Sequence, residues 1–212
     1  MKKLIALTTC LIFLSTSSIF AADKVANVRS FVQEVGDKII EIANNSKLSE
    51  SKKRDQSIAK IDDVIDADWI GRFVLGKNYK TATDVQKERF TKLYRDFMVN
   101  TYGPKFKNYN GRKFTVHEVT EKSGFFIVKA EFLTRDSNVP VSVDFRVKER
   151  EGKLAILDFI AEGISLIETQ RSEFNSAISQ KGMDKFLDDL EARVKKLKLS
   201  ATKYFNYTNT LV

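Results

Sequence analysis

The chain has very few of the residues that carry most metal and nucleophile chemistry. Its 212 residues include one cysteine, Cys10, and one histidine, His117. The common zinc sites need several cysteine and histidine ligands, so they cannot be built from this set. The sequence also has no G-x-S-x-G, P-loop or H-E-x-x-H motif. These absences predict a protein that is not an enzyme and that uses no metal or cofactor.

The amino-terminal residues have the pattern of a cleaved secretory signal. Two lysines open the chain, residues 4–14 are apolar, and residues 15–22 lead out through small side chains. The apolar stretch is shorter than the about 20 residues of a membrane-spanning helix. We expect a signal peptide over residues 1–21, cleaved after Ala21 or alternatively after Ala22. A lipid anchor on Cys10 is the competing interpretation, but Cys10 lies inside the apolar stretch rather than after it.

The exported chain would have no cysteine and only a modest charge. Without disulfides it must be stabilised by burial, and about 190 residues are enough for one core. Loss of the two lysines lowers the formal net charge from +8 to +6. No basic block or nucleic-acid-binding motif accompanies this charge, so we expect no nucleic-acid partner. A small positive excess suits an anionic membrane surface or an acidic partner.

The first half of the sequence predicts helices. Apolar residues recur at spacings of three and four in four segments, residues 23–43, 49–65, 66–75 and 83–102. Ser49 is placed to cap the second helix, and Asp66 or Asp68 to begin the third. Thr83 and Gln86 have the spacing of a capping box at the start of the fourth.

Beyond Gly103-Pro104, which is expected to stop or kink the last helix, the apolar period changes to two. Strands are predicted over residues 114–119, 125–134, 139–147 and 154–161. The third alternates strictly, with valine or phenylalanine at every second position from Val139 to Val147. Two helices, over residues 164–179 and 183–197, follow. The fold class is therefore α+β, a four-stranded antiparallel curved sheet packed against helices from both ends of the chain. One domain over residues 22–199 would end in a disordered tail, residues 200–212.

Two carboxylates are the main catalytic candidates. Asp158 and Glu162 lie near the end of an apolar strand, where burial could raise a pKa enough for general acid work. Capping of the following helix, or pairing with a basic residue, is the simpler interpretation. His117 is expected to be an exposed strand residue. A hydrolase using Asp158 and Glu162 therefore stands as a minor hypothesis.

What the sequence has in excess is phenylalanine. It has sixteen, of which Phe13 and Phe20 belong to the signal segment. Many of the others fall on the apolar faces of the predicted strands and helices. Periodicity does not distinguish a filled core from an apolar cavity with the same lining. Pattern alone therefore ends at an exported α+β domain.

Several motifs give the chain a family resemblance. They are Phe73-Val-Leu-Gly-Lys-Asn-Tyr-Lys-Thr-Ala-Thr83, Phe90-x-x-Leu-Tyr-x-x-Phe97, Thr101-Tyr-Gly103, Ile160-Ala-Glu-Gly-Ile-Ser-Leu-Ile167 and Lys181-Gly-Met-Asp184. In this order and spacing the chain resembles the MlaC family of periplasmic phospholipid-binding proteins, also called toluene-tolerance or ABC-transporter auxiliary proteins. The resemblance covers residues 25–197.

This resemblance implies a lipid carrier located in the periplasm. Its expected partners are a phospholipid, an inner-membrane ABC transporter complex with an MCE-type subunit, and an outer-membrane lipoprotein–porin complex. Shuttling between them would maintain the lipid asymmetry of the outer membrane, and the carrier would be a monomer. A lipid-independent adaptor or scaffold subunit of an envelope transport complex, with a solid core, is the alternative.

The resemblance also implies that an apolar pocket lies between the sheet and the helices. Its expected lining is Val74, Leu75, Tyr94, Phe97, Met98, Tyr102, Phe106, Phe126, Val128, Phe132, Val141, Val143, Phe145, Ile160, Ile164 and Ile167. Four lysines near the expected mouth are candidates for the head group, namely Lys77, Lys80, Lys105 and Lys107. Substitution of Val143 by glutamate is expected to block lipid retention in a folded protein.

Overall fold

The computed structural model describes the backbone of residues 16–107, 111–134 and 138–209, and the side chains of residues 22–102, 112–133 and 138–200. The helices are α1 (Thr16–Asn44), α2 (Glu50–Val64), α3 (Ala67–Leu75), α4 (Asn78–Thr81), α5 (Asp84–Lys107), α6 (Leu166–Lys181) and α7 (Met183–Asn209). The strands are β1 (Gly111–Lys122), β2 (Phe125–Thr134), β3 (Val141–Arg150), β4 (Lys153–Ala161) and β5 (Ile164–Ser165). This confirms the α+β class.

The strands form one open sheet in the order β1-β2-β3-β4-β5, with every neighbouring pair antiparallel. The sequence predicted four strands, and β5 is the addition. Glu162 and Gly163 have φ values of 52° and 77°, which reverse the chain after β4. Ile164 and Ser165 then pair back onto β4. A two-residue strand carries no periodicity, so the sequence could not reveal it.

The predicted helix starts are confirmed by their hydrogen bonds. Asp66 accepts from the backbone N–H of Trp69 at 2.8 Å, and Ser49 caps α2. The capping box is complete, because the Thr83 N–H donates to Gln86 at 3.0 Å and the Gln86 N–H donates to Thr83 at 3.2 Å. These caps are local, so the sequence alone identifies them.

Two helices extend beyond the ends expected from the sequence. Helix α5 continues through Gly103-Pro104 to Lys107. Proline removes one backbone donor, and so close to the end of a long helix the loss affects little of the helix. Helix α7 continues past Leu197 to Asn209, into the segment expected to be disordered. At the other end, α1 begins at Thr16, within the expected signal segment; residues 1–15 lie outside the described residues.

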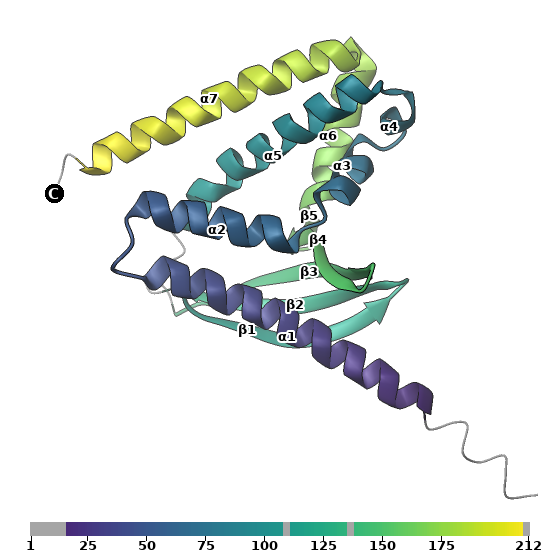
Figure 1. Ribbon diagram of the computed structural model, residues 1–212, viewed down its shortest axis with the longest axis vertical. Helices are drawn as coiled ribbons and strands as arrows, with labels where there is room; N and C mark the ends of the chain where they lie inside the picture. Colours follow the sequence, from purple (N-terminus) through teal and green to yellow (C-terminus); the bar gives the residue numbers. More distant parts are fainter. Residues whose placement is uncertain (1–15, 108–110, 135–137, 210–212) are drawn as a thin grey trace, which may run out of the picture.

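The apolar residues form two separate clusters rather than one core. One cluster, here called the helical cluster, joins α3, α5, α6 and α7, with Phe90, Phe174 and Leu187 at its centre. The other, here called the sheet cluster, joins α1 to one face of β1–β4. Figure 1 shows α5, α6 and α7 on one side of the molecule, the sheet with α1 on the other, and α2 between them. Helix α2 contacts α1, α5 and β4.

Helix α1 is fixed to the edge strand β1 by shape and by hydrogen bonds. Gly36 faces the ring of Phe114 so closely that a Cβ at Gly36 would lie 2.0 Å from Phe114 Cδ1. Gln33 donates to the Phe114 carbonyl and accepts from the Val116 N–H, both at 3.0 Å. Arg29 donates to the Val116 carbonyl at 2.7 Å. Backbone groups on the free edge of the sheet are thereby satisfied.

Candidate functional site

The face of the sheet that α1 covers carries a row of aromatic rings. Phe114 and Phe132 are paired across β1 and β2, and Phe145 and Phe159 across β3 and β4. Each ring contacts another ring of the row. The centroids are 4.7 Å apart for Phe114–Phe132, 6.1 Å for Phe114–Phe145 and 5.6 Å for Phe145–Phe159. Only Phe114 is buried, and the other three are half-buried. Because α1 contacts β1 and β2, the β3–β4 side of this row is covered less completely.

A pocket of about 500 Å³ opens at the hairpin end of the same face. It lies between α1, α2 and the β3–β4 hairpin. Its apolar lining is Val28, Phe31, Val64, Phe126 and Leu154. Four of these side chains, all except Val64, also belong to or pack against the sheet cluster. The volume is within the roughly 300–1,000 Å³ of pockets that bind small organic ligands.

The rim of this pocket is charged. Lys24, Lys60 and Lys153 come from α1, α2 and the β3–β4 hairpin, together with Asp63 and Glu149. Lys60 is paired with Asp63 at 3.3 Å. An apolar floor beneath a rim of lysines can bind a molecule with an apolar body and an anionic end.

The predicted lining residues divide between the two clusters. Val74, Leu75, Tyr94, Phe97, Met98 and Ile167 belong to or pack against the helical cluster. Phe126, Val128, Phe132, Val143 and Phe145 belong to or pack against the sheet cluster. Tyr102 and Ile160 are half-buried, and Phe106 lies outside the described side chains. Val141 and Ile164 are 40% and 64% exposed. Of the sixteen, Phe126 alone lines the 500 Å³ pocket.

The pocket depends on residues that sequence reasoning missed. The lysines of its rim come from three segments far apart in the chain, and no local pattern links them. Lys77 and Lys80, the earlier candidates, are exposed near α4 and line neither described pocket. Lys105 and Lys107 lie outside the described side chains. The sequence shows that Phe31 and Leu154 are apolar, but it does not show which side chains lie beside them in the pocket.

Val143 is a poorer test position than the sequence suggested. It is 3% exposed and lies opposite Ala130 and Ala161 in the neighbouring strands. A glutamate there would bury an unpaired charge, which costs several kcal/mol. We therefore expect Val143→Glu to unfold the protein rather than to report on lipid retention.

Asp158 holds the junction between β4 and α6. Its carboxylate accepts from Ser165 Oγ at 2.5 Å and from the backbone N–H of Ile167 at 3.2 Å, with Arg146 at 3.9 Å. Burial raises its pKa, against the opposing effect of these hydrogen bonds and of Arg146. Glu162 is exposed in the β4–β5 turn. This arrangement agrees with the capping interpretation and offers nothing in favour of a catalytic pair.

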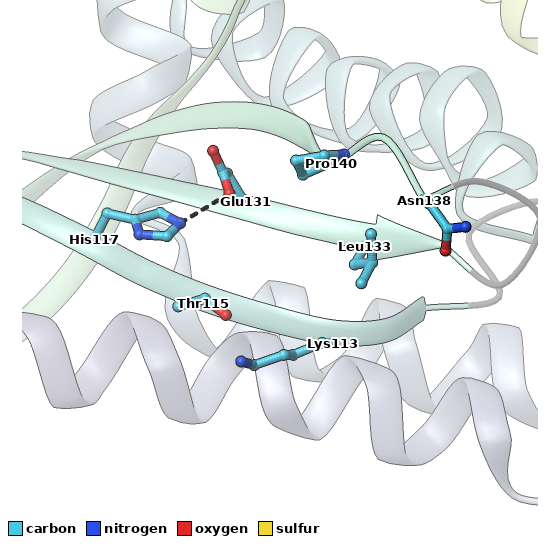
Figure 2. A pocket seen from close by; sticks show the side chains of 7 residues that line it. All are labelled: Lys113, Thr115, His117, Glu131, Leu133, Asn138 and Pro140. Atoms are coloured by element: carbon cyan, nitrogen blue, oxygen red, sulfur yellow. Dashed lines mark hydrogen bonds and ion pairs between the residues drawn. The ribbon is translucent and has the colours of Figure 1, made fainter.

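A second pocket, of about 320 Å³, lies on the opposite face of the sheet. Figure 2 shows its lining from β1 and β2, with His117 bonded to Glu131 at 3.0 Å. His117 is exposed, as the sequence predicted. The lining mixes lysine, histidine, glutamate and asparagine with Leu133 and Pro140, so it suits an acyl chain less well than the first pocket.

A buried polar network lies inside the helical cluster. Tyr94 donates to Gln170, and the Gln170 amide contacts Met98 Sδ at 3.0 Å. Burial raises the pKa of Tyr94, so this hydroxyl stays protonated. Among the described residues, no group of three or more histidine, cysteine, aspartate or glutamate side chains is placed to hold a metal ion. Within the same residues, no helix has the length and apolarity of a membrane span.

Comparison with known proteins gives consistent matches. The family model described as MlaC protein matches residues 33–192. The chain is 21% identical to the "Intermembrane phospholipid transport system binding protein MlaC" of Haemophilus influenzae, over 86% of this chain and 90% of that protein. It is 25% identical to the "Toluene tolerance protein ttg2D" of Pseudomonas putida, over 65% of this chain and 66% of that protein.

A solved structure has the same fold. It is the phospholipid-binding protein from Ralstonia solanacearum in complex with a phospholipid. The TM-score is 0.68 at 20% identity, over 79% of this chain and 98% of that chain. The matched family model spans most of the chain, including all strands of the sheet and most residues of both clusters. The chain belongs to the MlaC family.

Proposed function

We propose that this protein is a periplasmic phospholipid carrier. It would exchange lipid with an MCE-type ABC transporter complex in the inner membrane and with a lipoprotein–porin complex in the outer membrane, and so maintain outer-membrane lipid asymmetry. The observation that carries the proposal is the lysine-rimmed apolar pocket at the end of the aromatic sheet face. Membership of the MlaC family, whose relatives include a named phospholipid transport protein, supports it.

The apolar pocket meets the main physical requirement of such a carrier, which is to shield acyl chains from water. Each methylene kept from water is worth about 0.8 kcal/mol, so two acyl chains with about 30 methylenes hold on the order of 25 kcal/mol. A lipid therefore crosses water only if its chains are sheltered. Phe31 and Leu154 are half-buried at the pocket floor. We place the first part of the acyl chains against these two side chains.

The rest of the chains would extend along the aromatic row. A pocket of about 500 Å³ holds only part of a two-chain lipid, so a continuous apolar path is needed. The half-buried rings of Phe132, Phe145 and Phe159 lie on the same face as the pocket floor. Ring rotation and separation of α2 from the sheet would widen this path. The predicted lining residues of the sheet cluster keep their role in this proposal. Those of the helical cluster are packed within that separate cluster and lie outside the proposed path.

The rim supplies a site for the head group. Lys24 and Lys153 are exposed at the pocket mouth and have no ion-pair partner among the described residues. An ammonium binds phosphate as a point charge, without a fixed orientation. Such a rim would bind the phosphate that all phospholipids share. It would discriminate little between head groups.

The first experiment is native mass spectrometry with lipid extraction on the mature protein purified without detergent. We expect about one phospholipid per protein. In Leu154→Glu a charge enters the half-buried pocket floor, and bound lipid should fall at least tenfold, a loss of about 1.4 kcal/mol or more. Leu197→Glu is the matched control, because it changes a half-buried leucine of the helical cluster. The control should keep its lipid.

Two outcomes would contradict the proposal. A native protein that carries no lipid, and takes up none from vesicles, would favour the adaptor hypothesis and a solid core. Equal lipid loss in both leucine variants would mean that destabilisation, rather than the pocket, is responsible. Circular dichroism of both variants separates this second case from an unfolded sample.

A further inference from the structure

A second surface, on the other face of the sheet from the pocket, combines aromatic rings with cations. Trp69 and Phe73 of α3 are stacked with centroids 5.1 Å apart, and Phe125 of β2 meets Trp69 edge-on at 6.2 Å. All three rings are half-buried. Their edges therefore remain at the surface where α3 meets the start of β2. We call these three rings and the cations described next the α3 patch.

Two cations lie directly over these rings. Lys148 Nζ is 4.7 Å from the centroid of Phe125, and Arg171 Cζ is 4.7 Å from that of Phe73. Arg171 also donates to the Phe73 carbonyl at 2.8 Å, which fixes its position. Long basic side chains of this kind cover apolar surface with their stems and keep their charges in water.

The charge of the α3 patch is positive. No carboxylate forms an ion pair with Lys148, Arg171 or Arg72 in the part of the chain that the structure describes. The nearby acids Asp66 and Glu168 are instead held by Arg150 at 2.9 Å and by Arg146 at 3.2 Å. Asp68, in the first turn of α3, offsets part of the excess.

We propose that the α3 patch docks the protein onto an anionic lipid bilayer surface. Tryptophan and phenylalanine edges favour the interface between head groups and acyl chains, and lysine and arginine favour anionic head groups. An acidic protein surface could pair with the cations, but it would gain less from contact with the three aromatic ring edges. The bilayer is therefore the occupant that uses both halves of the patch.

The position of the α3 patch relative to the pocket makes docking useful. Phe125 and Lys148 are the strand neighbours of Phe126 and Glu149, which line the pocket. Side chains of successive strand residues point to opposite faces. The patch and the pocket mouth therefore share one end of the sheet and lie on its two faces. Docking through the patch would bring this end of the sheet, which also carries the pocket mouth, close to the lipid surface.

The experiment measures co-sedimentation of the mature protein with vesicles. Vesicles of phosphatidylcholine alone are compared with vesicles in which part of the lipid is phosphatidylglycerol. We expect clear binding to the anionic vesicles, weakened by added salt. Trp69 is the only tryptophan in the chain, so a blue shift of its emission on binding reports directly on the patch.

Variants that remove a positive charge test whether vesicles bind at the α3 patch. Lys148→Gln should weaken binding to anionic vesicles about fivefold, and Lys148→Gln with Arg171→Gln roughly 20- to 30-fold. The matched control is Lys92→Gln with Lys195→Gln, which removes two exposed charges from α5 and α7. It should change binding less than twofold. Lys148 forms no hydrogen bond with the described part of the chain, so Lys148→Gln loses none and stays informative if the Arg171 variant folds poorly.

Three results would overturn the inference. They are no preference for anionic vesicles, an equal loss in the control pair, or vesicle binding without any change in Trp69 emission. Failure of the carrier proposal is distinguishable, because Leu154→Glu should lose lipid and still dock. The Lys148 and Arg171 variants should dock poorly and still contain lipid. An acidic protein partner would be indicated if the patch variants lost transport activity without any vesicle binding in the native protein.

Discussion

At the scale of single residues, Asp158 shows how a buried carboxylate can be structural. Its two oxygens receive the Ser165 hydroxyl and the Ile167 N–H, which joins the end of β4 to the first turn of α6. Burial raises the pKa of Asp158 more than its partners lower it. The carboxylate therefore orders the junction while making its stability depend on pH.

Asparagine at position 158 should remove one part of this pH dependence. The folded state holds the Asp158 proton more tightly than the unfolded state, so the free energy of unfolding falls as the pH rises from the usual value of 3.8 through the raised pKa. Without a charge, asparagine can still accept from the Ile167 N–H through Oδ1, and its Nδ2 can donate to Ser165 Oγ with the direction of that bond reversed. Urea unfolding of the native protein and of Asp158→Asn across this range should show a shallower fall in the variant.

Alanine at position 158 is the matched comparison. It leaves the Ile167 N–H without its acceptor, which costs about 1–3 kcal/mol at every pH. A native protein and an Asp158→Asn variant with parallel pH profiles would show that another group is responsible.

Residue roles were predictable where their causes are local. The caps Asp66, Thr83 and Gln86 satisfy groups within three residues, and each was found from spacing. Asp158 was recognised as a capping candidate, but its use of Ser165 and Ile167 depends on the β5 reversal. The rim lysines of the pocket meet only because α1, α2 and a hairpin converge. Nothing in the sequence near any one of them indicates the other two.

At the scale of elements, the fit between α1 and β1 depends on a missing side chain. Glycine inside a helix usually costs stability, by roughly 0.5–1 kcal/mol relative to alanine. Glycine is needed at position 36 because the Phe114 ring occupies the space that a Cβ would fill. Gly71, in the middle of α3, is different: a Cβ there would meet Phe90 at 3.8 Å, an ordinary contact.

The two glycines should respond oppositely to alanine. Gly71→Ala should raise the free energy of unfolding by about 0.5–1 kcal/mol through helix propensity. Gly36→Ala should lower it by about 1–3 kcal/mol, because α1 must move away from Phe114. Denaturant unfolding of the two variants measures both changes.

A double variant identifies the cause at Gly36. If the contact with Phe114 is responsible, Phe114→Leu with Gly36→Ala should lose less stability than the two single losses combined. Simple additivity, or a stabilised Gly36→Ala protein, would contradict the close fit.

The elements themselves and several helix starts were predictable, but the carboxyl ends of α5 and α7 were not. Most of the helix and strand signals rest on apolar periodicity, which long segments carry strongly. Helix α5 continues through Pro104 and α7 continues to Asn209, although the local residues on which the prediction relied favour earlier ends. The short elements α4 and β5 have too few residues to carry a pattern.

At the scale of the whole molecule, the division into two apolar clusters decides where a lipid fits. The sequence predicted a sheet with a cover and apolar faces for both, and these are present. It did not indicate that the helices would close a cluster of their own around Phe90, Phe174 and Leu187. Residues that each lie on the apolar face of their own element, such as Phe97 in α5 and Phe145 in β3, therefore fall in different clusters. Which face packs on which depends on contacts between distant segments.

Lipid should stabilise the native protein and not the pocket variant. A ligand present at 100 times its dissociation constant adds about 2.7 kcal/mol to the free energy of unfolding. In a domain of this size that corresponds to a rise in Tm of roughly 5–10 °C. Differential scanning fluorimetry of delipidated protein with and without phospholipid checks it. Leu154→Glu should show almost no rise and Leu197→Glu a native rise; a rise in both leucine variants would put the lipid elsewhere.

The side chains that α1 lays along β1 affect how the chain folds during its synthesis. Unsatisfied edge strands are where chains pair with one another and aggregate. Arg29 and Gln33 precede the backbone groups that they satisfy by more than 80 residues. Ribosomes build chains from the amino terminus, and domains fold as their segments become available. The side chains that satisfy this edge are therefore synthesised before β1 itself. Strand β1 need never be exposed to a neighbouring chain without them.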